Sequence, residues 1–170
     1  MKRGELTPGQ KKAAATGGAS ALALAAAMAI LPVWEGKSNA PYFDSVKVKT
    51  VCYGETRVEM RWYSDGECVA MLREGARGFQ QGVLKVNPRI STDPLQWAAH
   101  TSLAYNIGLV AYRRSSVARL YAAGNERAAC EAIGKYKFAG GKVWRGLELR
   151  RQGDAGRFGE VELCKSGLGQ

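Results

Sequence analysis

Residues 35–56 read EGKSNAPYFDSVKVKTVCYGET and place two acids and a hydroxyl close together in the sequence. Glu35 is followed by Asp44 nine residues later and by Thr50 six residues after that. Hydrolysis of a glycosidic bond needs an acid that protonates the leaving oxygen and a carboxylate on the other side of the sugar. The spacing of these residues therefore predicts a small hydrolytic site.

The local pattern suggests how these groups are held. Residues 36–42 contain several turn formers and predict a loop, whereas residues 45–54 alternate in the manner of a strand, with Val46, Val48 and Thr50 on one side. Glu35 follows Trp34 and an apolar run, so partial burial should favour its neutral, proton-donating form. Asp44, in a polar loop, should stay ionised, and Thr50 would hold the attacking water.

Length and composition set broad limits. The chain has 170 residues, enough for one domain with its own core. Its net charge of +10 favours polyanionic partners such as nucleic acid, acidic lipid or a cell-wall polymer, without choosing among them. The basic residues are scattered and do not form a stripe with stacking aromatics, so we expect no nucleic-acid partner.

The cysteines and the histidine argue against a metal site. Cys52, Cys68, Cys130 and Cys164 lack the spacing of a metal site, and the chain has a single histidine. We therefore expect no metal and no cofactor. Export would make two disulfides the natural state of the cysteines, whereas a cytosolic chain would keep four thiols.

Residues 13–34 carry no charge and are long enough to span a bilayer as a helix. The preceding segment is basic, so its N-terminus should remain cytoplasmic. Ten of the 22 residues are alanine, so insertion should be weak. Three interpretations compete: a signal peptide cleaved near Ala27-Met28-Ala29, a buried alanine-rich helix, or a weak anchor that later leaves the membrane. We favour the third, because cleavage after Ala29 would remove most of the helix that supports Glu35.

Helical patterns dominate after residue 63. Ser64 and Glu67 form a capping-box pattern, and Thr92-Asp93-Pro94 opens another helix, which contains His100. A solvated or packed role is expected for His100 in preference to a catalytic one. The stretch after residue 152 is helical in pattern but is interrupted by glycines. The sequence thus predicts a small β-containing lobe over 35–63, then a larger helical lobe, with a substrate groove between them.

Several blocks resemble one known family. The pattern E-x8-D-x5-T at 35–50, the YNIG element at 105–108 and the block AGGKVWRGL at 139–147, followed by a pair of arginines, resemble the phage-type lysozymes, the endolysins of glycoside hydrolase family 24. The resemblance covers about residues 34–165. The alanine- and glycine-rich segment before Glu35 resembles the signal-anchor-release segment of certain members.

This resemblance implies an α+β, lysozyme-like fold: a small β-sheet lobe and a larger helical lobe, preceded by a weakly hydrophobic N-terminal signal-anchor helix. We expect a signal-anchor segment at 1–33 and a catalytic domain at 34–170. Glu35 would be the acid, Asp44 the carboxylate and Thr50 the water-positioning hydroxyl, with inversion at the sugar. Gly54 and Asn106 would line the sugar cleft. Glu55 departs from the family, in which many members have histidine.

The expected activity is a muramidase that cuts the β-1,4 bond between N-acetylmuramic acid and N-acetylglucosamine in peptidoglycan, for host lysis. A monomer is expected, held in the inner membrane through residues 13–34 and then released to the periplasm, with collapse of the membrane potential as the trigger. Two alternatives remain: a lytic transglycosylase that uses Glu35 without Asp44 and Thr50, and a basic, membrane-anchored binding module without chemistry.

The cysteines fall into two groups along this arrangement. Cys52 and Cys68 lie near the first lobe, and Cys130 and Cys164 lie in late helices. Of the three connectivities that four cysteines allow, we expect Cys52–Cys68 and Cys130–Cys164.

Overall fold

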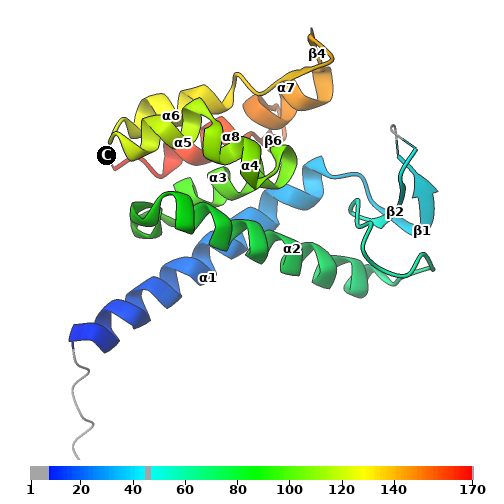
Figure 1. The fold of residues 1–170 in the computed structure, drawn as a ribbon, viewed down its shortest axis with the longest axis horizontal. Helices are drawn as coiled ribbons and strands as arrows, with labels where there is room; N and C mark the ends of the chain where they lie inside the picture. The colour runs from blue at the N-terminus through cyan, green and yellow to red at the C-terminus, as the bar shows by residue number, and fades with distance from the viewer. Residues whose placement is uncertain (1–7, 45–46, 170) are drawn as a thin grey trace, which may run out of the picture.

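A computed structural model describes residues 8–44 and 47–169, and it shows a β-hairpin beside a larger group of helices (Figure 1). The elements follow in the order α1 (Pro8–Trp34), β1 (Ser38–Phe43), β2 (Lys49–Cys52), α2 (Asp65–Val86), the 3-10 helix η1 (Pro88–Thr92), α3 (Pro94–Ile107), α4 (Leu109–Arg114), α5 (Ser116–Ala122), α6 (Glu126–Ile133), β3 (Phe138–Ala139), β4 (Lys142–Val143), α7 (Arg145–Gln152), β5 (Gly153–Asp154), β6 (Arg157–Phe158) and α8 (Glu160–Ser166).

The apolar helix α1 packs along α3 and α2 through one face. Ala23, Ala27 and Leu31 recur at four-residue spacing on this face and are fully buried. The Gln80 side chain donates a hydrogen bond of 2.7 Å to the carbonyl of Ser20 and fixes the helix on α2. On the other side Leu22 is 63% exposed. Within the described residues, one segment, 17–34, is long and apolar enough to cross a membrane, and 28% of it is buried here.

The hairpin of β1 and β2 follows directly after α1. Tyr42 pairs with Thr50 in antiparallel register, and the pairing is irregular between Ser38 and Tyr42. The expected loop over 36–42 is therefore wrong for most of its length, because pairing with β2 outweighs the turn formers. Pro41 is tolerated since an edge strand can spare one N–H group.

The strand pattern expected from residue 45 begins only at Lys49. The backbone turns sharply before it: the amide of Asp44 donates to the carbonyl of Val48 at 3.0 Å. Lys47 has a φ of 63° in this turn, and Val48 is 44% exposed. Val46 lies outside the described residues. Alternation alone did not reveal this turn, because valines and lysines alternate through it.

The long helices begin as their sequences predict. Ser64 caps α2 with Glu67 in a complete capping box, which confirms that expectation. Asp93 caps α3 through bonds to the amides of Leu95 and Gln96, and Gly108 ends it with a φ of 84°. Helix α3 forms the centre of the helical part and contributes fully buried Trp97 and Leu103.

His100 lies on α3, in the middle of this core. It is fully buried, and its Nδ1 atom is 2.7 Å from the hydroxyl of Tyr112. It is therefore a packed histidine, one of the two roles expected for it. Burial lowers the pKa of His100 to about 3, because the charged imidazolium would lose its hydration.

The glycine-rich end of the chain forms a tight hairpin between α7 and α8. Strands β5 and β6 are antiparallel, and the backbone of Gly159 comes back against that of Gly153. A Cβ atom on Gly159 would lie 2.3 Å from the Gly153 nitrogen, so no side chain fits there. The expected interruption of the helix is thus present, and the structure gives it the form of a β-hairpin.

The two disulfides join Cys52 to Cys68 and Cys130 to Cys164, the pairs expected from their placement. The first ties β2 to α2, and the second ties α6 to α8.

Candidate active site

Glu35 lies where α1 ends, and it lines two neighbouring cavities. Its amide donates the last helical hydrogen bond, 3.0 Å to the carbonyl of Leu31. The hairpin-side cavity, about 370 Å³, is also lined by Gly54, Glu55, Tyr105 and Asn106. The α7-side cavity, about 360 Å³, shares Glu35 and Asn106 and extends to other residues, among them Trp34, Trp144, Arg150 and Arg157. Glu35 and Asn106 therefore stand between two parts of one hollowed surface.

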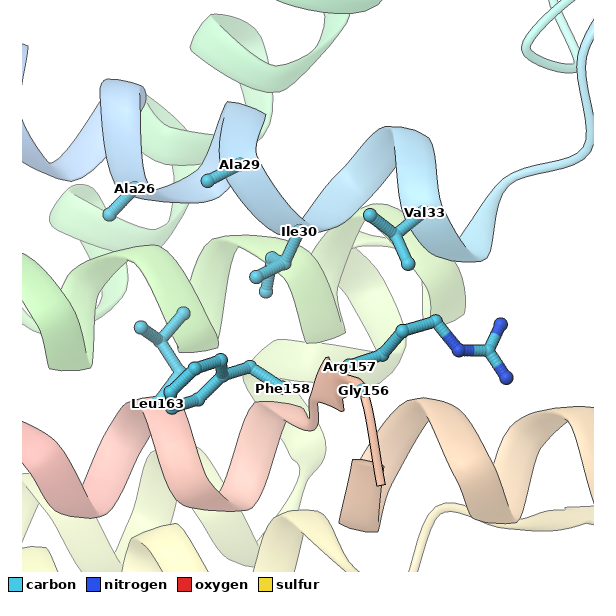
Figure 2. Close-up of a pocket in the computed structure, with 8 residues that line it drawn as sticks. All are labelled: Ala26, Ala29, Ile30, Val33, Gly156, Arg157, Phe158 and Leu163. Atoms are coloured by element: carbon cyan, nitrogen blue, oxygen red, sulfur yellow. The ribbon is translucent and has the colours of Figure 1, made fainter. Parts of the chain in front are cut away.

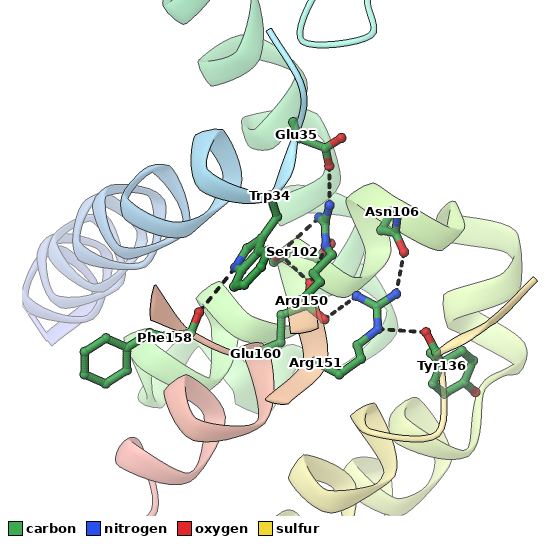
Figure 3. A network of polar contacts seen from close by, with 9 residues as sticks. All are labelled: Trp34, Glu35, Ser102, Asn106, Tyr136, Arg150, Arg151, Phe158 and Glu160. Atoms are coloured by element: carbon green, nitrogen blue, oxygen red, sulfur yellow. Dashed lines mark hydrogen bonds and ion pairs between the residues drawn. The ribbon is translucent and has the colours of Figure 1, made fainter. Parts of the chain in front are cut away.

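A buried guanidinium faces the Glu35 carboxylate (Figure 3). Arg150 is 3% exposed, and its Nη1 atom lies 2.5 Å from Oε1 of Glu35. Its Nε atom donates to Glu160 at 2.9 Å, and its Nη2 atom donates to the carbonyl of Ser102 at 3.1 Å. Burial by itself lowers the pKa of Arg150, but the carboxylates of Glu160 and Glu35 outweigh this effect and raise it. The guanidinium is therefore a permanent positive charge beneath Glu35.

The surroundings of Glu35 combine partial burial with a neighbouring charge. Its side chain is partly buried, 21% exposed, as the sequence suggested. Its nearest polar neighbour, however, is a cation instead of an apolar wall.

The second arginine of the pair fixes Asn106. Arg151 is fully buried; it contacts Glu160 at 2.5 Å and the carbonyl of Tyr136 at 2.9 Å. It also donates to the side-chain oxygen of Asn106. Because this oxygen is occupied by a guanidinium, the NH2 group is the part of Asn106 that can be offered to a ligand.

The hairpin-side cavity carries a second acid that the sequence did not single out as functional. Burial raises the pKa of Glu55, but hydrogen bonds from the Arg57 side chain and from the amides of Arg57 and Thr56 outweigh it, so the net shift is downward. Burial, together with the charges of Glu35 and Glu55, raises the pKa of Tyr105 to about 12, so its hydroxyl keeps its proton. This wall therefore offers an ionised carboxylate and a neutral phenol.

Gly54 follows β2 and has a φ of 85°, a conformation that favours glycine. An added Cβ atom would meet nothing within 4 Å, so backbone conformation, not space, requires glycine here.

Asp44 and Thr50 lie on the hairpin and line neither of these two cavities. Asp44 accepts a hydrogen bond of 2.8 Å from the amide of Val48 in the turn after β1. Thr50 is 3% exposed, and its hydroxyl is 3.5 Å from the carbonyl of Tyr42. The structure thus brings Glu35, Gly54 and Asn106 to one cavity, and it places Asp44 and Thr50 together on the adjoining hairpin.

Arg150 and Glu160 are site residues that sequence reasoning missed. The adjacent arginines were noticed only as part of a matching block, and Glu160 lies beyond the glycine-rich interruption. The sequence did offer one signal for a buried ion-pair network: two adjacent arginines, Arg150 and Arg151, lie ten residues or fewer before the acid Glu160. The partner Glu35 is 115 residues away from Arg150 and gives no local clue.

Comparisons with known proteins agree with this picture. The model of the family described as phage lysozyme matches residues 32–154. The chain is 34% identical over 152 residues to the SAR-endolysin of Enterobacteria phage P21, covering 84% of this chain and 90% of that one. It is 32% identical over the same length to the SAR-endolysin of Enterobacteria phage PA-2, with the same coverage.

Among solved structures, the active form of the P1 phage endolysin Lyz has a TM-score of 0.72 at 20% identity, covering 85% of each chain. The endolysin from Escherichia coli O157:H7 phage FAHEc1 has a TM-score of 0.70 at 23% identity, covering 82% of this chain and 90% of that one. These likenesses establish the fold: α+β and lysozyme-like, with a small β lobe and a larger helical lobe.

The family match and the SAR-endolysin relatives identify a glycoside hydrolase of the muramidase type. The chain belongs to the phage lysozyme family, and it is an endolysin that acts on peptidoglycan in host lysis.

Proposed function

We propose that Glu35 is the general acid that protonates the leaving oxygen when this enzyme cuts the bond between N-acetylmuramic acid and N-acetylglucosamine. The observation that carries the proposal is its position: a carboxylate at the junction of two cavities, fixed from below by buried Arg150. A sugar chain that occupies both cavities passes over Glu35. Its glycosidic oxygen is then within reach of the acid.

Proton donation requires the Glu35–Arg150 pair to loosen. In the structure, Oε1 of Glu35 is engaged by the Arg150 guanidinium at 2.5 Å. Bound sugar displaces water from the groove and brings a hydrogen-bond acceptor to the carboxyl. This acceptor then competes with Arg150 for the Glu35 carboxyl group. Arg150 keeps its other partners, Glu160 and Ser102, and so remains satisfied when Glu35 turns away.

Asp44 and Thr50 supply the other side of the reaction in this proposal. Asp44 stabilises positive charge on the sugar and helps to activate a water molecule, which the Thr50 hydroxyl holds. The support is their common scaffold: Thr50 pairs with Tyr42, two residues before Asp44. Because neither lines the two cavities, the sugar must contact the hairpin itself, either by reaching it or by drawing it over the groove.

Asn106 and Gly54 contact substrate in this proposal. The free NH2 group of Asn106 suits an acceptor such as the carbonyl of an N-acetyl group. Gly54 lets the chain approach the hairpin backbone closely, since it has no side chain.

Residues 1–33 form the signal anchor and residues 34–170 the catalytic domain in this proposal. The anchor spans the inner membrane with a cytoplasmic N-terminus, and release places a monomer in the periplasm. The positive charge suits an anionic wall polymer and not nucleic acid. Support comes from the span at 17–34 and from the SAR-endolysin names of the relatives. The expected orientation rests on Lys2, Arg3, Lys11 and Lys12, of which Lys2 and Arg3 lie outside the described residues.

The products of digestion test this proposal. Purified sacculi are digested with the full chain, and the released muropeptides are analysed by mass spectrometry. Hydrolysis adds one water to each cut bond and leaves a reducing N-acetylmuramic acid. Muropeptides lighter by one water, with a 1,6-anhydro end, would identify a lytic transglycosylase and contradict the roles of Asp44 and Thr50. Binding without any product would contradict the proposed chemistry altogether.

A further inference from the structure

The hairpin of β5 and β6 contacts the residue next to Glu35. Trp34, the last residue of α1, donates a hydrogen bond of 3.2 Å from its indole Nε1 to the carbonyl of Phe158 (Figure 3). The guanidinium carbon of Arg157 lies 4.4 Å from the centre of the Trp34 ring, within cation–π range. Two consecutive residues of β6 therefore hold one indole, through a backbone carbonyl and through a charge.

Arg157 is itself fixed within the hairpin. Its Nε atom donates to Asp154 at 2.8 Å, and a second hydrogen bond runs from its Nη2 atom to the same carboxylate oxygen. Asp154 is on β5 and pairs in register with Arg157. The close approach of Gly153 and Gly159 closes the base of the hairpin, as described above. The short β5–β6 hairpin thus holds the Arg157 guanidinium in a fixed position next to Trp34.

The same hairpin forms one wall of an apolar cavity against the last turns of α1 (Figure 2). This cavity, about 330 Å³, is lined by Ile30 and Val33 of α1 and by Arg157 and Phe158 of β6. Figure 2 shows the Arg157 side chain extending beneath Val33, toward the end of α1 where Trp34 lies. The hairpin thus faces the end of α1 from Ile30 to Trp34 and not only at the indole.

The end of α1 is intrinsically weak and needs outside support. Pro32 lies inside the helix and has no amide to donate, so the last turn lacks one backbone hydrogen bond. Gly36 follows Glu35, and open space surrounds the position that a side chain would take there. The contacts of Trp34 are therefore important for fixing the position of Glu35, the next residue in the chain.

We propose that the β5–β6 hairpin clamps the end of α1, and that Arg157 is a positioning residue that holds Glu35 in place through Trp34. The inference rests on the proposed role of Glu35 and deepens it. Helix α1 reaches its docked position only outside the membrane. The acid site is therefore complete only when α1 has been released and Trp34 has made its contacts with the hairpin.

Hydrogen exchange and kinetics of the full chain in detergent-free buffer test the proposal together. Arg157→Ala removes the cation, and Arg157→Lys keeps a positive charge near the ring. Trp34→Phe keeps a ring and removes the indole donor. Arg89→Ala is the matched control, because Arg89 is also exposed, also pairs with a carboxylate, Glu126, and also lies over a ring, that of Tyr121.

For Arg157→Ala we expect exchange at the amides of residues 33–35 to accelerate about two- to fivefold, the range for losing an exposed cation–π contact. The maximal rate on sacculi should fall by about the same factor, whereas the melting temperature stays constant. Arg157→Lys should recover part of both changes. Trp34→Phe should act in the same direction as Arg157→Ala, and Arg89→Ala should change neither readout.

Other outcomes would overturn the proposal. Unchanged exchange at residues 33–35 would show that no clamp exists, whatever the activity. Faster exchange with an unchanged maximal rate would show that the clamp does not position Glu35. A raised half-saturating concentration with unchanged exchange would make Arg157 a substrate-binding residue. The exchange readout needs no activity, so it stands apart from the role of Glu35, which Glu35→Gln tests separately.

Discussion

The Nη1 atom of Arg150 lies 2.5 Å from Oε1 of Glu35, although 115 residues separate the two. This contact connects the end of the apolar helix α1 to the buried core of the helical lobe. It depends on α1 lying in its docked position, because Glu35 is the first residue after that helix. Under the proposed release from the membrane, Glu35 and Arg150 can therefore meet only after α1 has packed on α3 and α2.

Replacement of Arg150 should destabilise the protein strongly. Arg150→Ala leaves the fully buried Glu160 with one guanidinium instead of two, and breaking a buried ion pair costs about 3–5 kcal/mol. Urea unfolding of the purified protein measures the change. Arg145→Ala is the control: Arg145 is 75% exposed and pairs with Glu148 on the surface, so its loss should cost less than about 0.5 kcal/mol. Equal effects of the two substitutions would contradict the buried network.

Removal of each disulfide should have a different effect on stability and on activity. From the loop lengths of 34 and 16 residues, the Cys130–Cys164 bridge is expected to stabilise by about 4 kcal/mol and Cys52–Cys68 by about 3 kcal/mol. Paired Cys→Ser variants, unfolded in urea, measure these values. Because Cys52 lies two residues before Gly54, only loss of the first bridge should also lower the rate on sacculi at a temperature where both variants are folded. A rate loss confined to the other pair would contradict the placement of the site.

His100 should make the fold sensitive to mild acid. Its pKa is about 3 in the folded protein against an ordinary value of 6.5, so below pH 6.5 the unfolded chain binds a proton that the folded chain refuses. Stability should therefore fall by up to about 1.4 kcal/mol per pH unit from pH 6.5 downward, and level off near pH 3. The rings of Tyr112 and Tyr121 face the imidazole and do not titrate in this window.

The comparison is made between wild type and His100→Gln from pH 7 to pH 5, above the range in which most carboxylates titrate. The substituted protein should start less stable and lose less on acidification. Parallel losses in the two proteins would show that the buried imidazole is not the source of the acid sensitivity.

Replacing Gly17 and Gly18 by leucine should keep the protein in the membrane. Added Cβ atoms at these two positions meet nothing within 4 Å, so the docked fold tolerates the larger side chains. In the membrane each leucine strengthens insertion. Fractionation of cells before and after membrane de-energisation should find the double leucine variant in the membrane fraction, whereas a double serine variant at the same sites should be released at least as readily as wild type. Unchanged release of the leucine variant would contradict a weak anchor.

The sequence predicts some elements well because their signals are local. The capping box of Ser64 and Glu67 and the Asp93 cap each depend on residues within one turn, and both are present. The hairpin was predicted less well, because a valine–lysine alternation runs through the turn at 44–48. Strand β1 was missed, since its pairing partner β2 supplies the hydrogen bonds that its own composition does not suggest.

Some residues of the candidate site could likewise be predicted from local sequence, and others could not. Glu35, Gly54 and Asn106 were expected from sequence and line one cavity. Arg150, Arg151 and Glu160 were not expected as site residues, because their roles depend on burial and on contacts between distant segments. The polar surroundings of Glu35 follow from these contacts, and no local pattern around residue 35 contains them.

The hydrolysis rate of Glu35→Gln on purified sacculi tests the central claim most directly. Glutamine keeps the shape and cannot donate a proton, so we expect the rate to fall at least about a hundredfold, with the fold retained by circular dichroism. Glu131→Gln, which alters an exposed carboxylate paired with Lys165, should keep the wild-type rate. A folded Glu35→Gln protein that digests sacculi as fast as wild type would contradict the account.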